Sequence, residues 1–307
     1  MTLKWMLSAG TGSLVAALGT VTLIGGTAWS APSKGVQAAP AAAPSSKAAI
    51  GFVNPGAATA PPGYVIETAD FTATNNVQST GSVACPSGTV AWGGGADSAS
   101  DSLAVNLNSS ISYGGGAGWE AWVNNASGAD TAFTVYVVCA NIPTNYQVID
   151  SSSLDNPSGA QTSVTAACPK RTVALGGGGY SDSGNTNVNV NTDEPTTIGK
   201  AQGWRVDVNN GSGSDALFRT EAICAKKPKG YHIQSAGADN PPATETAIPA
   251  SCPVNTSVVG GGVLSSSGST SVNVNSTGPD GSGGWLSWEN NGSGADASMT
   301  TFAVCAK

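Results

Sequence analysis

One pattern of about 80 residues occurs three times in the sequence, and each copy contains two cysteines. Successive copies are offset by 83 and 84 residues, as measured at the first cysteines, Cys85, Cys168 and Cys252. A Gly-Trp pair keeps nearly the same period, with its tryptophans 85 and 81 residues apart at Trp119, Trp204 and Trp285. A period held over such a long region is a sign of internal duplication. The chain is therefore predicted to contain three similar units.

These repeats divide the chain into five segments. Residues 1–30 combine Lys4, an apolar stretch and small residues before Ala31, a pattern typical of a cleaved signal peptide. An uncleaved membrane anchor is the alternative, because the apolar stretch is nearly long enough to span a bilayer. Residues 31–63 are rich in Ala, Pro, Gly and Ser and predict a flexible linker. The three repeats follow at 64–145, 146–230 and 231–307. We expect a secreted, extracellular protein that is not attached to a membrane once the signal is removed.

Each repeat is predicted to close with its own disulfide bond. Six cysteines allow 15 pairings, and the repeat favours one set, which is Cys85–Cys139, Cys168–Cys224 and Cys252–Cys305. In the chain-entropy account, a loop of this length contributes roughly 4 kcal/mol of stability per bridge. A zinc site is the rival use of cysteine, but the chain has no Cys-x-x-Cys pair and one histidine, His232. We therefore expect neither a metal nor a cofactor.

The repeats read as antiparallel β-structure. Val-Asn-Val-Asn at residues 188–191 and 272–275 alternates apolar and polar side chains, as in a strand with one buried face. Asn-Gly at 210–211 and 291–292 is typical of a hairpin turn. The predicted fold class is all-β, with three tandem repeats of five or six antiparallel strands. Small sandwiches in a row and one unit with pseudo-threefold symmetry are both compatible with the pattern.

The repeat resembles a known type of secreted β-repeat. The motifs that carry the resemblance are Cys-Pro-x-x-Thr-Val-x-x-Gly-Gly-Gly, the Gly-Trp strand and the closing Val/Ile-Cys-Ala. They are similar to a repeat of secreted proteins from high-GC bacteria, sometimes found in modular surface or tail proteins, and that repeat implies no particular reaction or ligand. Threefold repetition also resembles the β-prism of vitelline membrane outer layer proteins, which is the second architecture considered.

Charge and motifs argue against two classes of function. The chain has 19 acidic and 12 basic residues, so it lacks the Lys and Arg patches with which proteins bind nucleic acid. His232 occurs in one repeat alone, and no nucleophile motif accompanies it. The acidic residue common to all three repeats lies in a turn, at Asp130, Asp215 and Asp296. The protein is therefore predicted not to be an enzyme.

Residue types that differ between repeats are candidates for binding, whereas shared types are most simply required by the fold. Three residues after each shared tryptophan, the repeats have Trp122, Asp207 and Trp288. An odd offset along a strand places Trp122 and Trp288 on the face opposite to the core tryptophan. Exposed aromatic rings on a polar face are typical of a binding surface. Glu120, Asn124 and Asn290 are close in sequence and are predicted to donate or accept hydrogen bonds to a ligand.

Two functions fit these residues. The first is a non-catalytic binding protein for polysaccharide or a cell-wall surface, with Trp122 and Trp288 as stacking platforms. The second is a structural or adhesive repeat protein without a small-molecule ligand, in which the same tryptophans fill interfaces between repeats or chains. The sequence leaves the ligand, the biological role and the oligomeric state open.

Overall fold

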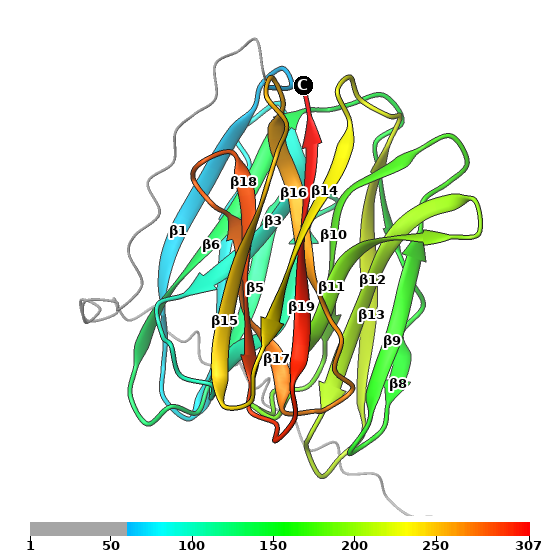
Figure 1. The fold of residues 1–307 in the computed structure, drawn as a ribbon. Helices are drawn as coiled ribbons and strands as arrows, with labels where there is room; N and C mark the ends of the chain where they lie inside the picture. Colours follow the sequence, from blue (N-terminus) through cyan, green and yellow to red (C-terminus); the bar gives the residue numbers. More distant parts are fainter. Residues whose placement is uncertain (1–59) are drawn as a thin grey trace, which may run out of the picture. The chain divides into compact units, whose positions relative to one another are not determined.

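The computed structural model describes residues 60–307. The predicted signal peptide (1–30) and all but the last four residues of the predicted linker (31–63) lie outside this range. Residues 60–307 contain 19 β-strands and no helix, as the sequence predicts (Figure 1). Each repeat supplies six strand positions, and the first strand of repeat 2 is split into two short pieces.

The strands follow the three repeats in order. Repeat 1 contains β1 (Val65–Ala73), β2 (Val77–Ala84), β3 (Thr89–Ser98), β4 (Val105–Tyr113), β5 (Gly118–Asn125) and β6 (Thr131–Asn141). Repeat 2 contains β7 (Gln147–Asp150), β8 (Leu154–Asn156), β9 (Gln161–Ala167), β10 (Val173–Ser181), β11 (Val188–Ile198), β12 (Ala201–Asn210) and β13 (Ala216–Ala225). Repeat 3 contains β14 (His232–Asn240), β15 (Thr244–Ser251), β16 (Ser257–Ser265), β17 (Val272–Pro279), β18 (Gly284–Asn291) and β19 (Ala297–Ala306).

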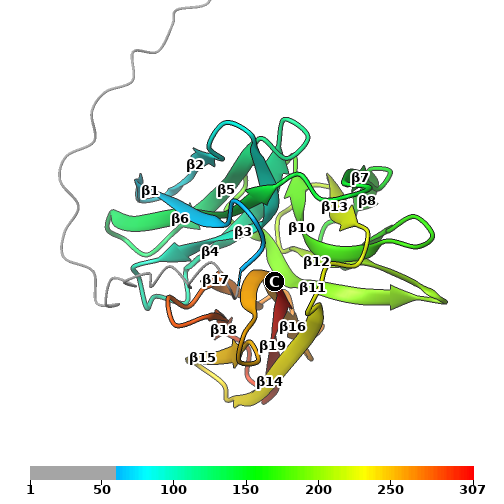
Figure 2. The same ribbon diagram turned by 90° about the horizontal axis from the view of Figure 1, so that it is seen from above.

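Every sheet is shared by two repeats. Sheet A has the order β1-β6-β3-β17-β18-β15, sheet B the order β2-β5-β4-β10-β13-β7 with β8 also on β13, and sheet C the order β14-β19-β16-β11-β12-β9. Each repeat contributes to two sheets, with three strands in each case except that repeat 2 gives four to sheet B, so the repeats join in a closed ring (Figure 2). The two half-sheets of a repeat pack on each other and enclose its core. The repeats are thus sandwiches and also parts of one pseudo-threefold unit.

Glycines allow the three repeats to meet at the centre of this ring. A Cβ atom on Gly93 would lie 2.7 Å from Cα of Gly260, one on Gly176 would lie 2.9 Å from Cα of Gly93, and one on Gly260 would lie 3.3 Å from Cα of Gly176. The backbones of β3, β10 and β16 therefore approach too closely for any side chain. The next glycine of repeat 1, Gly94, lies against the ring of Trp119, and the other two repeats have the same arrangement. This packing explains the glycine cluster of each repeat.

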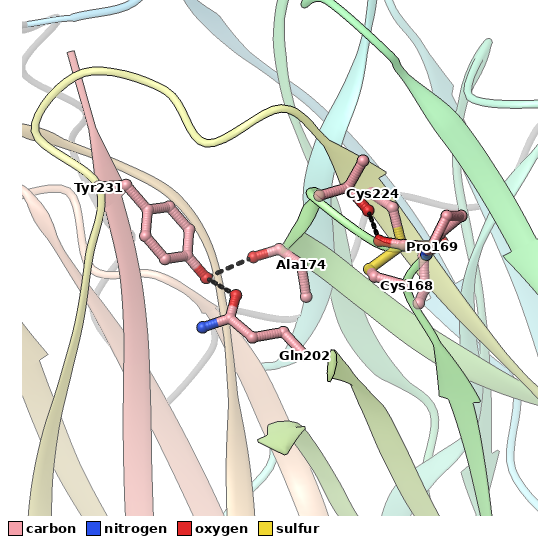
Figure 3. Close-up of a disulfide and its surroundings, with 8 residues drawn as sticks. Cys168, Pro169, Ala174, Gln202, Cys224 and Tyr231 are labelled. Carbon is pink, nitrogen blue, oxygen red and sulfur yellow. Dashed lines mark hydrogen bonds between the residues drawn. A yellow bond between two sulfur atoms is a disulfide. The ribbon is translucent and has the colours of Figure 1, made fainter. Parts of the chain in front are cut away.

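A tyrosine at the start of each repeat ties it to the preceding repeat in the ring. The three hydroxyls donate to backbone carbonyls, Tyr64 to Val258 at 2.9 Å, Tyr146 to Ala91 at 2.7 Å, and Tyr231 to Ala174 at 2.8 Å. Figure 3 shows Tyr231, whose hydroxyl oxygen also lies 2.9 Å from Oε1 of Gln202, so that the two acceptors share its one proton. The bond from Tyr64 to Val258 joins repeat 1 to repeat 3 and so closes the ring.

The disulfide pairing predicted from the repeat is confirmed. The bonds are Cys85–Cys139, Cys168–Cys224 and Cys252–Cys305, and no free cysteine occurs among residues 60–307. Each bond fastens the segment before β3, β10 or β16 to the last strand of the same repeat, as Figure 3 shows for Cys168 and Cys224. Disulfides of this kind form and persist in oxidising compartments.

Candidate functional site

Trp122 is a partly exposed tryptophan on the outer face of sheet B. Three residues earlier on the same strand, Trp119 is fully buried in the core of repeat 1. On β18, Trp288 is likewise partly exposed and Trp285 fully buried. Since side chains alternate between the two faces of a strand, the two tryptophans of each strand lie on opposite faces of its sheet. This part of the prediction is confirmed.

A tyrosine from the next repeat braces the ring of Trp122. Tyr180 lies on β10, and the centroid of its ring is 5.1 Å from that of Trp122, with the two ring planes at 69°. This is the edge-to-face arrangement that aromatic pairs prefer. Trp122 belongs to repeat 1 and Tyr180 to repeat 2, so the pair spans the boundary within sheet B. Both rings are partly exposed.

The guanidinium group of Arg219 lies beside these rings and interacts with several carboxyl groups. Cζ of Arg219 on β13 lies 5.6 Å from the centroid of the Tyr180 ring, within the range of a cation–π interaction. Arg219 also forms an ion pair with the exposed Asp150 on β7. Glu120 lies two residues before Trp122 and on the same face of β5. Burial raises the pKa of Glu120, and the charge of Arg219 partly opposes that increase.

Glu221 is the most buried acid of this group. It follows Arg219 by two residues on β13, and its Oε1 accepts a hydrogen bond of 3.3 Å from the backbone N–H of Ser112 on β4. Its pKa is raised to about 7, chiefly by burial and also by the charge of Asp150, while Ser112 and Arg219 oppose the increase. We call the set of side chains on this face the sheet B patch, and it consists of Glu120, Trp122, Asp150, Tyr180, Arg219 and Glu221.

The sequence matches no protein-family model and no curated protein. The chemistry of the sheet B patch is therefore the basis for inferring function. Within residues 60–307, no group of three or more His, Cys, Asp and Glu side chains is placed to hold a metal ion. The same residues include no helix that is long and apolar enough to span a membrane.

Asn124 and Asn290 do not have the ligand-binding position expected from the sequence. Both side chains are fully buried, so they cannot reach a ligand on the outer faces. Nδ2 of Asn124 donates to the backbone carbonyl of Val188 in repeat 2 at 2.8 Å, and Nδ2 of Asn290 donates to that of Val105 in repeat 1 at 2.8 Å. Asn209 makes the same bond to Val272 at 2.7 Å. These asparagines hold neighbouring repeats together, which explains their presence in all three.

Trp288 lies on sheet A, apart from the sheet B patch. On sheet A, Leu286 stands at the position that corresponds to Glu120 on sheet B. Asp97 stands at the position that corresponds to Tyr180. Of the five residues expected to bind a ligand, the structure therefore brings together Glu120 and Trp122 alone. The two tryptophans have different surroundings.

Sheet C has charged side chains at the corresponding place. Asp207 replaces the tryptophan there and is buried. Arg205 forms ion pairs with Asp207 and with Glu194, the latter at 3.4 Å. Burial raises the pKa of Glu194 to about 7 although Arg205 opposes that increase. An aromatic platform at this position is thus a property of sheets A and B and is not required by the fold.

Sequence reasoning missed four members of the sheet B patch, the fourth being Glu221 on β13. Tyr180, Arg219 and Asp150 belong to repeat 2, and the pairing of β10 with β4 brings them beside Trp122. The useful signal was the variation between repeats, because Tyr180 aligns with Asp97 and Leu264, and Arg219 aligns with two threonines. That variation marks candidate residues but does not show that they meet.

Proposed function

We propose that the protein is a secreted, non-catalytic binding protein for polysaccharide, and that the sheet B patch is its main binding site. The observation that carries the proposal is the partly exposed ring of Trp122, braced by Tyr180 and flanked by carboxyl and guanidinium groups. Sugar rings combine an apolar face with a rim of hydroxyls. A fixed indole ring with charged groups beside it offers complementary contacts to both.

Extracellular location is part of this proposal. Three disulfides are consistent with an oxidising compartment, and residues 1–30 read as a signal peptide. Trp288 on sheet A supplies a second contact in the proposal, because it presents a partly exposed indole ring on a different face. A protein with two such faces can hold more than one polysaccharide strand.

The proposal is tested by sedimentation with insoluble polysaccharides. The disulfide-bonded protein is incubated with chitin, cellulose or peptidoglycan, and the bound fraction is measured. Trp122→Ala should weaken binding by about 1 to 3 kcal/mol, as expected for loss of an aromatic anchor. Ile142→Ala is the matched control, because Ile142 is 65% exposed and lies outside the patch. Equal binding of the Trp122→Ala variant and the unaltered protein would contradict the proposed site.

A structural role is the second candidate, and one observation favours it. Trp122 contacts Tyr180 across the boundary between repeats 1 and 2, so its ring also packs an interface. If interface packing is its main role, Trp122→Ala should destabilise the protein as much as a core substitution does. Neither the variant nor the unaltered protein should then bind polysaccharide. Unfolding and sedimentation measured on the same variant separate the two roles.

A further inference from the structure

We propose that the sheet B patch selects sugars that carry a free, protonated amino group, so that its ligand is a polymer containing unacetylated amino sugars. This inference rests on the proposed function and names the class of sugar. It follows from the charge of the patch, from the aromatic ring beside that charge, and from the differences between sheets A and B.

Carboxyl groups outnumber cations in the patch. Glu120, Asp150 and Glu221 all interact electrostatically with the guanidinium of Arg219, and no second cation of residues 60–307 contributes to the electrostatics of Glu120 or Glu221. Arg219 is already paired with Asp150 and lies over Tyr180. At about pH 6 Glu221 is largely protonated, because its pKa is raised to about 7, so the remaining negative charge belongs to Glu120, two residues from Trp122 on the same strand face. A ligand with positive charge would therefore be attracted here, whereas an anionic sugar would be repelled.

The aromatic ring adds to the preference for a cation. An ammonium group within about 6 Å of a tryptophan ring is attracted by the negative face of its π-system, and tryptophan is the best of the aromatic side chains for this purpose. Glu120 lies two residues from Trp122 on the same strand face, so its carboxylate can accept a hydrogen bond from an ammonium group near the ring. An acetylated amine is neutral, so it loses the cation–π attraction, and its amide N–H donates a hydrogen bond without the attraction of opposite charges.

No basic residue of repeat 1 offsets the carboxylate of Glu120. From Tyr64 to Asn145 the sequence has six acidic residues and no basic residue. On sheet A, by contrast, Leu286 stands at the position of Glu120. Trp288 thus provides an internal comparison, an indole ring without the carboxylate two residues before it.

The test compares two oligosaccharides of equal length, one of glucosamine and one of N-acetylglucosamine. Binding is measured by calorimetry at about pH 6, below the pKa of an ordinary amino group. We expect the glucosamine oligomer to bind about tenfold more tightly. A cation–π contact together with a charged hydrogen bond can supply a difference of this size. Its affinity should fall as salt is raised, because salt screens exposed charges.

Two variants assign the selectivity to its source. Glu120→Gln should reduce the tenfold preference toward one and leave binding of the acetylated oligomer unchanged, whereas Trp122→Ala should weaken binding of both. Asp101→Asn is the control for net charge, because Asp101 is exposed and lies between β3 and β4, outside the patch. It should preserve the preference.

The outcomes separate this inference from the proposed function. Equal or tighter binding of the acetylated oligomer would overturn the selectivity and leave the polysaccharide-binding function standing. An undiminished preference in the Glu120→Gln variant would also overturn it, since the carboxylate would then have no part in recognition. Absence of binding to both oligomers and to the insoluble polysaccharides would refute both proposals.

Discussion

Glu289 is a carboxylic acid inside the core of repeat 3, where repeats 1 and 2 have Val123 and Val208. Its side chain is fully buried, and its Oε1 accepts a hydrogen bond of 2.8 Å from Nδ2 of Asn240. Burial raises its pKa to about 7, although hydrogen bonding by Asn240 and Ser265 lowers it. Glu194 and Glu221 have pKa values raised to about 7 for the same reason. The folded protein therefore holds protons that the unfolded chain would release.

This proton uptake predicts that the protein is more stable in mild acid than at neutral pH. The pKa of Glu289 is higher in the folded state than its ordinary value of 4.5, so its contribution to stability is fully present below about pH 4.5 and is lost as the pH rises to about 7. The change is about 3 kcal/mol for this residue. Urea unfolding at both ends of that range should show the unaltered protein losing stability relative to the Glu289→Gln variant. A constant difference between the two proteins would contradict the assignment.

Trp119 and Trp122 are expected to respond oppositely to substitution. Trp119 is fully buried, and its Nε1 donates to Oγ of Ser110 at 2.9 Å, so Trp119→Ala should cost about 3 to 5 kcal/mol of stability. Trp122 is partly exposed and makes one aromatic contact with Tyr180, so Trp122→Ala should cost about 1 kcal/mol. Thermal and urea unfolding measure both. Similar losses of stability in the two variants would indicate that the main role of Trp122 is packing.

The strands β3, β10 and β16 are the elements that hold the ring together. Their glycines allow three backbones to meet, while each joins the half-sheet of another repeat through a single register pair, Ala96 with Thr277, Gly179 with Ser110, and Val263 with Asp193. Because each of these pairings is so short, the attachment between repeats depends largely on close packing at the centre of the ring. The buried asparagine and tyrosine hydrogen bonds add to it.

Gly93→Ala tests the role of this close approach. The new methyl group would lie 2.7 Å from both Cα of Gly260 and the carbonyl oxygen of Val259, and backbone atoms cannot move aside as a flexible side chain can. We expect a loss of at least about 1 to 3 kcal/mol, as for overpacked cores. Gly184→Ala is the matched control, because no atom lies within 4 Å of its added Cβ. Equal unfolding midpoints for the two variants would show that the centre of the ring can expand.

Residues 60–307 form a ring in which every sheet contains strands from two repeats. Removal of repeat 3 would leave β1-β6-β3 and β11-β12-β9 without the half-sheets that extend them. It would also remove the carbonyl of Val258, which accepts the hydrogen bond from Tyr64. The exposed strand edges of such a fragment would be available for pairing with other chains.

Unfolding is therefore expected to be cooperative across all three repeats. Calorimetry should give one transition whose measured enthalpy equals the van 't Hoff enthalpy. A fragment of residues 64–230 should associate or fail to fold, as judged by light scattering and circular dichroism. Three resolved transitions, or a stable monomeric fragment, would show instead that the repeats behave as independent domains.

Local sequence patterns determined the parts of this protein that depend on neighbours in the chain. The spacing of the cysteines predicts the disulfides, because pairing within each repeat is the arrangement that all three copies can share. Period-two alternation predicts the strands and separates Trp119 from Trp122, because adjacent side chains must point to opposite faces. A comparison of the repeats would also have distinguished Glu289 from Val123 and Val208.

Tertiary structure alone decided which strands pair between repeats. The alternation of Val-Asn-Val-Asn predicts one buried face, but in β11 and β17 the asparagines are buried as well. Alternation does not specify the partner along the edge of a strand, since backbone hydrogen bonds are the same for every residue type except proline. The pairing of β10 with β4 brought Tyr180 and Arg219 beside Trp122. Contacts with β11 and β4 of the neighbouring repeats hold the buried side chains of Asn124 and Asn290. The candidate site spans two repeats, so its composition depended on contacts between distant segments that no local pattern encodes.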